Sequence, residues 1–464
     1  MADVFTATDP TTGKVVREVE ALDAQGLEEV LARSEAAYDD WRRRSFADRA
    51  AVLEGVGAAM REDTERLALL MTEEMGKPIT EARGEVAKAA WAAEHYAAHA
   101  EEYLAAQELA SDATRSYVQH LPLGPVLGVL PWNAPFWLAF RFIAPALMAG
   151  NTCVVKHDRH VPGCAQAIGE VVSAVAAEHG APADILQVAP MGHELVETAL
   201  RDPRIRAVSV TGSDRAGSSV AAIAGSEIKP SVLELGGSDP AIVLADADLE
   251  HAAEVIATMR IINAGQSCIA AKRVIVERPV HDRFVDLLTE RLAALRVGDP
   301  REESTQIGPI AREDLRENLH RQVTESVEQG ATLRLGGEMP EGTGFFYPVT
   351  LLTDVGAGMT ACTEETFGPV AAVVAVDSEE EAIRAANDTQ YGLAASVWTT
   401  TERGVRLAAE IETGQVAVNG IVKTDPRLPS GGVKKSGYGR ELGPHGIREF
   451  VNPQQVWVGP KQDG

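Results

Sequence analysis

The sequence predicts an α/β protein built from two domains, each with an open parallel sheet. After residue 111, short β-rich runs alternate with helical segments, which is the order of a parallel sheet covered by helices on both faces. A second set of the same kind follows Gly237. The 464 residues, of which 45% are hydrophobic, also exceed what one compact core needs. We therefore expect two α/β domains with a cleft between them.

The first part of the chain is expected to be helical. Apolar residues recur at helical spacing over residues 23–42, and Asp23 can cap the N-terminus of that helix. A second helix is expected over about residues 47–61, and Gly76 and Pro78 end a third. A long Ala-rich helix then runs from Thr80 to about residue 104. We expect these helices to serve packing alone.

Strand candidates follow in two groups. The first group covers residues 116–121, 126–130, 152–156, 185–188, 207–211 and 232–235, with a helix over 165–179. The second covers residues 241–244, 272–277, 371–375, 395–399 and 415–418. The last segment, residues 449–458, alternates apolar and polar residues but has no obvious partner in its own domain. We expect it to pair with another sheet.

Charge and targeting signals restrict the location and the partners. The formal charge of −25, from 43 basic and 68 acidic residues, opposes binding to nucleic acid or anionic membranes. The first ten residues contain neither a basic nor an apolar export region. The apolar run over residues 136–150 contains Arg141 and Pro145 and is too short to span a bilayer. We expect a cytoplasmic protein that acts on small molecules.

One of the four cysteines differs from the others. The four are Cys153, Cys164, Cys268 and Cys362. Their spacing fits neither a zinc site nor a disulfide scaffold, so a reduced compartment and no metal are expected. Three of them are most simply read as small hydrophobic residues. Cys268 has Gly265 and other small neighbours, which leave room for a substrate.

Cys268 and Glu234 together predict covalent chemistry on an aldehyde. A cysteine attacks only as its thiolate, so its site must lower its pKa or deprotonate it on demand. Glu234 follows the apolar residues Val232 and Leu233, and burial there favours a raised pKa or a water chain. A thiol that attacks a carbonyl and a carboxylate that activates water are the two groups that make and hydrolyse a thioester.

Two further motifs suit this chemistry. Attack on an aldehyde produces an oxyanion, and the side-chain amide of Asn133, with the backbone N–H of Cys268, can stabilise it. The alternative for Asn133 is a turn beside a packed indole. Residues 210–217 form a strand-to-helix turn with Gly212 and Gly217, where a helix N-terminus can bind pyrophosphate. The alternative there is an ordinary turn.

These motifs resemble a known family. The segments Leu-Glu-Leu-Gly-Gly around Glu234 and Asn-Ala-Gly-Gln-Ser-Cys ending at Cys268 resemble the two signature motifs of the aldehyde dehydrogenase superfamily. Pro-Trp-Asn-Ala-Pro around Asn133, Glu-Glu-Thr-Phe-Gly-Pro over residues 364–369 and the ending over residues 431–441 also match. The resemblance covers nearly the whole chain, and its motifs occur in the family's order.

The resemblance implies a fold of two Rossmann-like open-sheet α/β domains and a small β oligomerisation element. The cofactor-binding domain is expected over residues 1–110 and 124–236, and the catalytic domain over 237–430. Residues 111–123 and 449–464 are expected to form the oligomerisation element. A homodimer or homotetramer is the implied state.

The resemblance also assigns a nicotinamide cofactor. It implies cofactor contacts for Trp132, Lys156, Arg159, Gly212, Ser213, Gly217, Leu235, Glu365 and Phe367. Where the family has Lys-Pro-Ser-Glu, this chain has Lys-His-Asp-Arg, so that a cation, Arg159, replaces a carboxylate. Such a change favours the 2′-phosphate of NADP without excluding NAD. The alternative is that Arg159 is simply solvated.

The implied mechanism ends in a free acid. Cys268 adds to the aldehyde, Asn133 and the Cys268 N–H stabilise the oxyanion, hydride passes to the nicotinamide, and Glu234 activates water. Members of the superfamily that pass the acyl group to coenzyme A lack this glutamate. Its presence favours hydrolysis over acyl transfer. A thiol hydrolase and a catalytically silent binding protein are the other classes, and the latter would usually have lost Cys268 or Glu234.

Arg141 suggests a substrate class. It stands where succinate semialdehyde dehydrogenases carry an arginine that binds the distal carboxylate, and several runs of the chain resemble the bacterial branch of those enzymes. The second arginine of the animal-type enzymes is Ile262 here, and Arg260 or Lys423 is a possible replacement. The best candidate is succinate semialdehyde or a similar aldehyde. The alternative is an apolar or aromatic aldehyde, in a pocket bounded by Trp137 and Phe136.

Two departures concern local packing. Ser430 stands where the family usually has Phe, which is expected to alter the packing around it. Asn419 follows a predicted strand and fits the family's structural Asn near the site.

Overall fold

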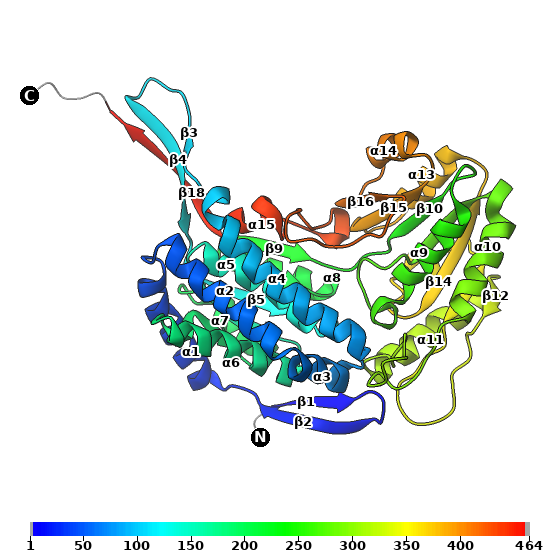
Figure 1. Cartoon of the computed structure of the whole chain (residues 1–464), viewed down its shortest axis with the longest axis horizontal. Coiled ribbons are helices and arrows are strands. Elements are labelled where there is room, and N and C mark those ends of the chain that lie inside the picture. Colours follow the sequence, from blue (N-terminus) through cyan, green and yellow to red (C-terminus); the bar gives the residue numbers. More distant parts are fainter. Residues whose placement is uncertain (1–2, 460–464) are drawn as a thin grey trace, which may run out of the picture.

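The chain folds into two lobes and a projecting β arm. The computed structural model describes residues 3–459, so residues 1–2 and 460–464 of the predicted segments lie outside the described residues. One lobe holds most of the first half of the chain, and the other holds the segment from β10 (Pro240–Val243) to β16 (Gln415–Val418) (Figure 1). Among the described residues, no helix is long and apolar enough to cross a membrane. The mixed α/β architecture with parallel sheets is the predicted fold class.

The first lobe is organised by a six-stranded sheet in the order β17-β9-β8-β5-β6-β7. Its strands are β5 (Pro125–Leu130), β6 (Thr152–His157), β7 (Leu186–Val188), β8 (Ala207–Thr211), β9 (Ser231–Glu234) and β17 (Gly437–Tyr438). All neighbours are parallel except β17, which runs antiparallel to β9. The parallel strands agree with the predicted ones to within one residue at each end. The antiparallel β17 was not predicted.

Helices cover both faces of this sheet. The connecting helices are α5 (Pro135–Met148), α6 (Pro162–Glu178), η1 (Ala183–Ile185), α7 (His193–Arg201) and α8 (Asp214–Ser226). Cys153 and Val155 of β6 pack into a core with α5 and α6, whereas Val154 packs with α7 and α8 on the opposite face. Alternate strand residues point to opposite faces, so both faces of a parallel sheet must be apolar.

The second lobe contains a seven-stranded sheet in the order β12-β13-β14-β11-β10-β15-β16. Its strands are β10 (Pro240–Val243), β11 (Arg273–Glu277), β12 (Thr332–Leu335), β13 (Thr350–Thr353), β14 (Val370–Val376), β15 (Ala394–Trp398) and β16 (Gln415–Val418). Its helices are α9 (Leu249–Ile261), η2 (Ile262–Gly265), α10 (Arg278–Ala293), α11 (Glu313–Glu328), α12 (Thr360–Thr363), α13 (Glu379–Asn387) and α14 (Thr401–Ala408). The segments η3 (Lys434–Ser436) and α15 (Gly443–Arg448) return to the first lobe.

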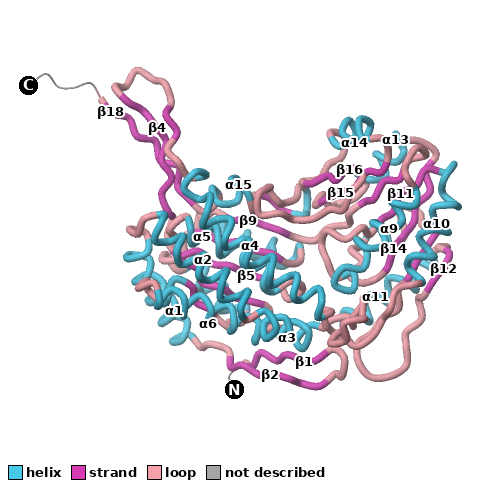
Figure 2. The backbone as a smooth tube through the Cα atoms, viewed as in Figure 1, coloured by secondary structure: helices cyan, strands magenta, loops and turns pink. Residues whose placement is uncertain are grey.

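The N-terminal helices agree with the prediction, but the hairpin before them was missed. The helices are α1 (Ala24–Trp41), α2 (Phe46–Glu62), α3 (Thr64–Met75) and α4 (Ile79–Tyr103). Asp23 caps α1 by accepting the N–H of Gly26, and Gly76 ends α3 with a φ of 77°. Strands β1 (Val4–Asp9) and β2 (Lys14–Glu20) form an antiparallel hairpin along the lower edge of the first lobe (Figure 2).

Helix α5 is buried along its whole length. It lies against α4, which supplies a cap for it: the Glu85 carboxylate accepts the backbone N–H groups of Phe136 and Trp137 at 2.9 and 3.2 Å. A helix N-terminus has unpaired N–H groups, and a buried one needs such a partner. The two helices therefore fix Asn133, which lies just before α5, and Arg141, which lies within it.

The projecting arm is a three-stranded sheet in the order β18-β4-β3. Strand β18 (Val451–Val458) pairs antiparallel with β4 (Arg115–Pro122) along its whole length, and β3 (Gln107–Glu108) adds to the other edge of β4. The predicted C-terminal strand thus pairs outside both large sheets, as expected.

One buried amide joins the arm to the first lobe. The Asn151 Oδ1 accepts the N–H groups of Leu123 and Gly124, just after β4, at 2.8 and 3.1 Å. Its Nδ2 donates to the carbonyls of Phe450, just before β18, and of Ala146 at 2.8 and 3.2 Å. The side chain is fully buried, so water cannot replace these bonds.

Replacing Asn151 by Ala should weaken this junction. The change leaves three backbone groups without a partner, since the Ala146 carbonyl still accepts the backbone N–H of residue 151. We expect a loss of about 2–4 kcal/mol in the free energy of unfolding. Thermal unfolding of the variant and the parent checks this. Asn452→Ala in β18 is the matched control, because Asn452 is exposed. An unchanged Tm for Asn151→Ala would contradict the role assigned to the amide.

Candidate active site

A cavity of about 480 Å³ lies where the two lobes meet. Its wall takes Lys88 from α4, Trp137 and Arg141 from α5, Cys268 after η2, and residues 421–424 after β16. Asn133 lies in the same wall. The structure therefore brings the predicted nucleophile, oxyanion donor and substrate residues to one cavity, large enough for a small molecule.

The loop before Cys268 has an unusual backbone. Asn263 and Ala264 have φ values of 56° and 54°, in the left-handed region that non-glycine residues rarely adopt. Gly265 follows with a φ of 75°, and a Cβ there would lie 2.3 Å from the Gly368 carbonyl oxygen. The loop is therefore pressed against the Phe-Gly-Pro segment of the second lobe. This close approach requires glycine at position 265.

The thiol of Cys268 is half-buried at the cavity wall. Burial raises its pKa to about 11, while the charges of Lys272 and Arg141 act to lower it. Lys272 is fully buried and donates to the carbonyls of Ser267 and Cys268 at 2.9 and 2.6 Å. These bonds fix the backbone at the nucleophile. A thiol with this pKa is protonated at neutral pH and needs a base before it can attack.

Asn133 is held by both lobes. Its backbone carbonyl accepts bonds from Lys77 Nζ at 3.0 Å and from Asn263 Nδ2 at 2.8 Å. Its side-chain Nδ2 donates to the Gln266 carbonyl at 3.1 Å. An amide nitrogen carries two protons, so one N–H remains for an oxyanion beside Cys268. Lys77 itself is buried and ion-paired with Glu85.

Glu234 belongs to a buried ion-paired group of three. Arg141 contacts Glu234 Oε2 through Nη2 at 3.1 Å and Glu441 Oε2 through Nε at 2.6 Å. Side-chain exposure is 5% or less for all three residues. Glu441 also accepts the Ser209 hydroxyl at 3.3 Å. Two carboxylates thus share one guanidinium, a geometry in which each side chain depends on the others.

Glu234 keeps one carboxylate oxygen without a partner. Oε1 is buried and makes no hydrogen bond among the described residues, and it lies against Gly431, where a Cβ would approach it to 2.6 Å. Burial raises the pKa of Glu234 to about 7, with Arg141 opposing this shift and Glu441 adding to it. A carboxyl group with a pKa near 7 and a free oxygen is suited to take a proton from water.

Several predicted cofactor residues lie together beside Cys268. Trp132 packs edge-on against Phe367 with ring centroids 5.8 Å apart. Glu365 accepts the Gly237 N–H at 3.1 Å and lies 3.2 Å from Lys272 Nζ. A Cβ on Gly236 would approach Glu365 to 2.6 Å, so this position requires a residue without a side chain. The two lobes meet at these contacts.

The phosphate turn and the cations at the end of β6 also fit a dinucleotide. Ser213 caps α8 by accepting the Ala216 N–H, and a Cβ on Gly217 would approach Leu235 to 2.5 Å. Lys156, the last residue but one of β6, is half-buried and has no hydrogen-bond partner among the described residues. Burial lowers its pKa, and the Asp158 charge opposes this. An amine without a hydrogen-bond partner and a helix N-terminus are groups that hold ribose and phosphate oxygens.

Arg159 is more exposed than Lys156. Its guanidinium donates to the Val4 carbonyl at 2.6 Å and lies 3.3 Å from Asp3. The N-terminal hairpin therefore tethers this cation at the carboxyl end of β6.

Two substrate expectations need correction. Arg260 is fully buried, and its guanidinium binds the backbone carbonyls of Thr366, Gly368 and Val370, so it does not reach the cavity. Phe136 packs in the core and does not line the cavity. Both expectations failed because spacing along the chain does not show which way a side chain points. Ile262 and Lys423 do line the cavity.

Arg141 departs in part from its expected role. It lines the cavity, but Nη2 and Nε face Glu234 and Glu441, so the guanidinium is already paired. Ser430, where the family usually has Phe, places its hydroxyl 3.4 Å from Nη2 of Arg141.

Asn419 joins the ends of β15 and β16 through both backbone groups of Thr399. Sequence reasoning missed Glu441 and Lys88, because neither stands in a predicted catalytic segment.

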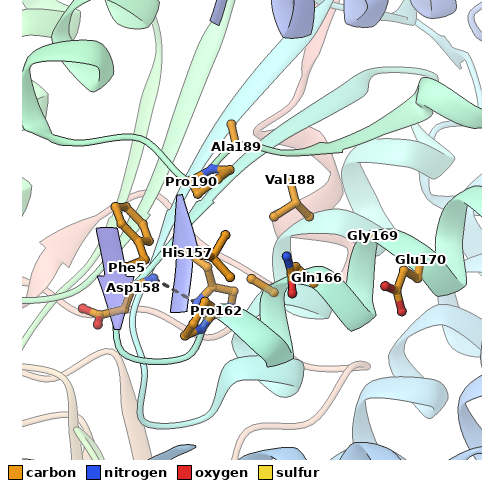
Figure 3. A pocket seen from close by; sticks show the side chains of 12 residues that line it. Phe5, His157, Asp158, Pro162, Gln166, Gly169, Glu170, Val188, Ala189 and Pro190 are labelled. Atoms are coloured by element: carbon orange, nitrogen blue, oxygen red, sulfur yellow. Dashed lines mark hydrogen bonds between the residues drawn. The ribbon is translucent and has the colours of Figure 1, made fainter. Parts of the chain in front are cut away.

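A second hollow of about 320 Å³ lies at the carboxyl ends of β6 and β7, under the N-terminal hairpin. Phe5, Pro162, Val188 and Pro190 give it a largely apolar wall (Figure 3). Of its polar residues, which include His157, Gln166 and Glu170, Asp158 accepts bonds from His160. None of its lining residues lines the cavity at Cys268.

Comparisons with known proteins agree with this geometry. The model of the aldehyde dehydrogenase family matches residues 2–456. The chain is 45% identical to a protein of Mycobacterium ulcerans named succinate-semialdehyde dehydrogenase [NADP(+)] 1, with 97% of this chain and 99% of that protein covered. It is 43% identical to succinate-semialdehyde dehydrogenase [NADP(+)] of Mycobacterium avium, over 98% of this chain and 97% of that one.

Solved structures are similar over the whole chain. Succinic semialdehyde dehydrogenase from Streptococcus pyogenes in complex with NADP⁺ has a TM-score of 0.95 and 36% identity, covering 98% of this chain and 100% of that chain. An aldehyde dehydrogenase of Mycobacterium tuberculosis complexed with NAD⁺ has a TM-score of 0.94 and 36% identity, covering 99% and 95%.

Proposed function

The chain belongs to the aldehyde dehydrogenase family, and we propose that it oxidises succinate semialdehyde to succinate with NADP⁺ as the preferred cofactor. The family makes it an NAD(P)-dependent oxidoreductase that acts on aldehydes. The observation that carries the narrower proposal is that Arg141, Lys88 and Lys423 line the same cavity as Cys268. A cationic wall suits an aldehyde that carries a carboxylate. The names of the Mycobacterium relatives support the same choice.

Acylation begins with the thiol of Cys268. Its proton is lost to water, and the charges of Lys272 and Arg141 act to stabilise the thiolate. When bound, the nicotinamide would supply the hydride acceptor. The free N–H of Asn133 and the backbone N–H of Cys268 stabilise the oxyanion that forms when the thiolate adds to the aldehyde.

Deacylation depends on Glu234. After the thioester has formed at Cys268, Glu234 takes a proton from a water molecule, which attacks the acyl carbon. Its unpartnered Oε1 is the oxygen available for that water, because Oε2 is held by Arg141. Arg141 thus keeps the base oriented and prevents its pKa from rising further.

We assign cofactor binding to residues whose positions fit the two ends of a dinucleotide. Lys156, Arg159 and the N-terminus of α8 are assigned to the ribose and phosphates, and Trp132, Leu235, Glu365 and Phe367 to the nicotinamide end. Two cations at the end of β6 favour a 2′-phosphate. The NADP⁺ named for the relatives supports this preference.

The assembly is proposed as a homodimer or homotetramer in the cytoplasm. The arm of β3, β4 and β18 projects from the first lobe (Figure 1). Trp457 and Leu121 are exposed on it at 49% and 36%. Apolar side chains on a projecting strand pair suit a contact with a second copy.

A panel of aldehydes tests the proposed substrate and cofactor. We expect kcat/KM for succinate semialdehyde to exceed that for butanal by about 100-fold, because a bound carboxylate in a desolvated site contributes about 2–3 kcal/mol. With the preferred aldehyde, kcat/KM should be higher with NADP⁺ than with NAD⁺. Reduced-cofactor formation measures both. Equal kcat/KM values for succinate semialdehyde and butanal would exclude succinate semialdehyde as the preferred substrate. A higher kcat/KM with NAD⁺ would exclude NADP⁺ as the preferred cofactor.

The pH dependence tests the contact between Arg141 and Glu234. Glu234 must be deprotonated to act as a base, so hydrolysis-limited turnover should rise with pH through about 7. Arg141→Met removes a charge that lowers the pKa of Glu234, and the rise should move to higher pH. This shift of the pH profile should occur with every aldehyde. An unmoved profile, with only KM for carboxylate-bearing aldehydes raised, would mean that Arg141 acts on the substrate alone.

A further inference from the structure

Lys88 is a charged side chain of the cavity wall. Lys88 lies on α4, facing the segment after β16. Its Nζ donates to the Thr424 hydroxyl at 2.9 Å and lies 4.1 Å from the centroid of the Trp137 ring. Trp137 donates to the same hydroxyl at 3.0 Å. Lys88 is therefore positioned by two side chains of the wall, and its ammonium keeps two protons without a partner.

The other charged groups around this cavity form ion pairs or hydrogen bonds within the protein, or are exposed to solvent. Lys77 is paired with Glu85, and Arg141 with Glu234 and Glu441. Glu81 accepts the Asn263 N–H at 2.8 Å. Lys423 is exposed.

Among the described residues, no carboxylate forms an ion pair with Lys88, although it is largely withdrawn from solvent. Burial, with the Arg141 charge adding to its effect, lowers the pKa of Lys88 to about 8. A desolvated, unpaired cation is costly in a folded protein. A ligand carboxylate would remove that cost.

We propose that Lys88 is the specificity-determining cation that binds the distal carboxylate of the substrate. The inference rests on the proposed oxidation of a carboxylate-bearing aldehyde at Cys268 and names the residue that recognises that carboxylate. Arg141 is less available, because Nη2 and Nε already face two carboxylates. Lys88 offers two free N–H donors from the opposite helix. The aldehyde is then held between Lys88 at one end and Cys268 at the other.

The charges around Lys88 predict a pH dependence of substrate binding. Arg141 and Lys423 disfavour the charge on Lys88, whereas Glu85 and Asp425 favour it. Glu85 and Asp425 are themselves paired with Lys77 and Arg427. Above about pH 8 the free enzyme loses the Lys88 proton, so KM for succinate semialdehyde should rise there. KM for butanal, which has no carboxylate, should not rise over the same pH range.

The test compares two methionine variants on two aldehydes. In Lys88→Met, we expect KM for succinate semialdehyde to rise about 30-fold or more with kcat lowered less, because a charged hydrogen bond to the substrate is lost. Butanal kcat/KM should fall no more than about threefold, which also shows that the variant folds. Lys423→Met removes the other lysine discussed for this cavity, which is exposed to solvent, and should raise KM for succinate semialdehyde by much less than Lys88→Met does. Lys88→Arg should recover part of the loss.

Each outcome has a distinct meaning. If parent enzyme prefers succinate semialdehyde but Lys88→Met keeps that preference, the assignment of Lys88 is wrong and the proposed function stands. If Lys423→Met loses the preference instead, recognition belongs to Lys423. An equal loss on both aldehydes means that Lys88 only supports the cavity wall. A parent enzyme without any preference overturns the proposed substrate itself.

Discussion

The contact of Arg141 with Glu234 and Glu441 is the interaction on which the rest of the site depends. It joins α5, the end of β9 and the segment before α15, which come from distant parts of the chain. A buried carboxylate without this guanidinium would be protonated, and a buried guanidinium without both carboxylates would be an uncompensated charge. The three side chains set the orientation of the base and the pKa at which it works.

A second constraint is that the site exists only where the lobes meet. Cys268 and Glu365 come from the second lobe, whereas Asn133 and Glu234 come from the first. The bonds of Asn133 with Asn263 and Gln266, and of Glu365 with Gly237, cross that boundary. The glycines at 236, 237 and 265 let the backbones approach closely enough. The segments that carry thiol, oxyanion donor and base are thereby held together by hydrogen bonds between side chains and backbone, which is the preorganisation that acyl chemistry requires.

The sequence was sufficient for the main strands of both sheets, for the N-terminal helices and for the motif residues, because these depend on local periodicity and on contiguous segments. It did not indicate that Arg141 pairs with Glu441, since residues far apart in the chain meet only through the fold. The same reason explains the position of Arg260, which resembled a candidate for the cavity and instead binds backbone carbonyls. Lys88 sits in an Ala-rich helix whose pattern indicates packing alone. The hairpin β1-β2 was missed because its exposed second strand lacks an apolar face.

The central claim is that Cys268 carries the acyl group until Glu234 activates water. Intact-protein mass spectrometry of Glu234→Gln, mixed with succinate semialdehyde and NADP⁺, tests this most directly, because the variant should form the thioester and not hydrolyse it. The account predicts a mass increase of one succinyl group, mapped to the peptide that contains Cys268 and absent from the Cys268→Ala, Glu234→Gln double variant. No adduct while reduced cofactor still forms, or an adduct on another residue, would contradict it.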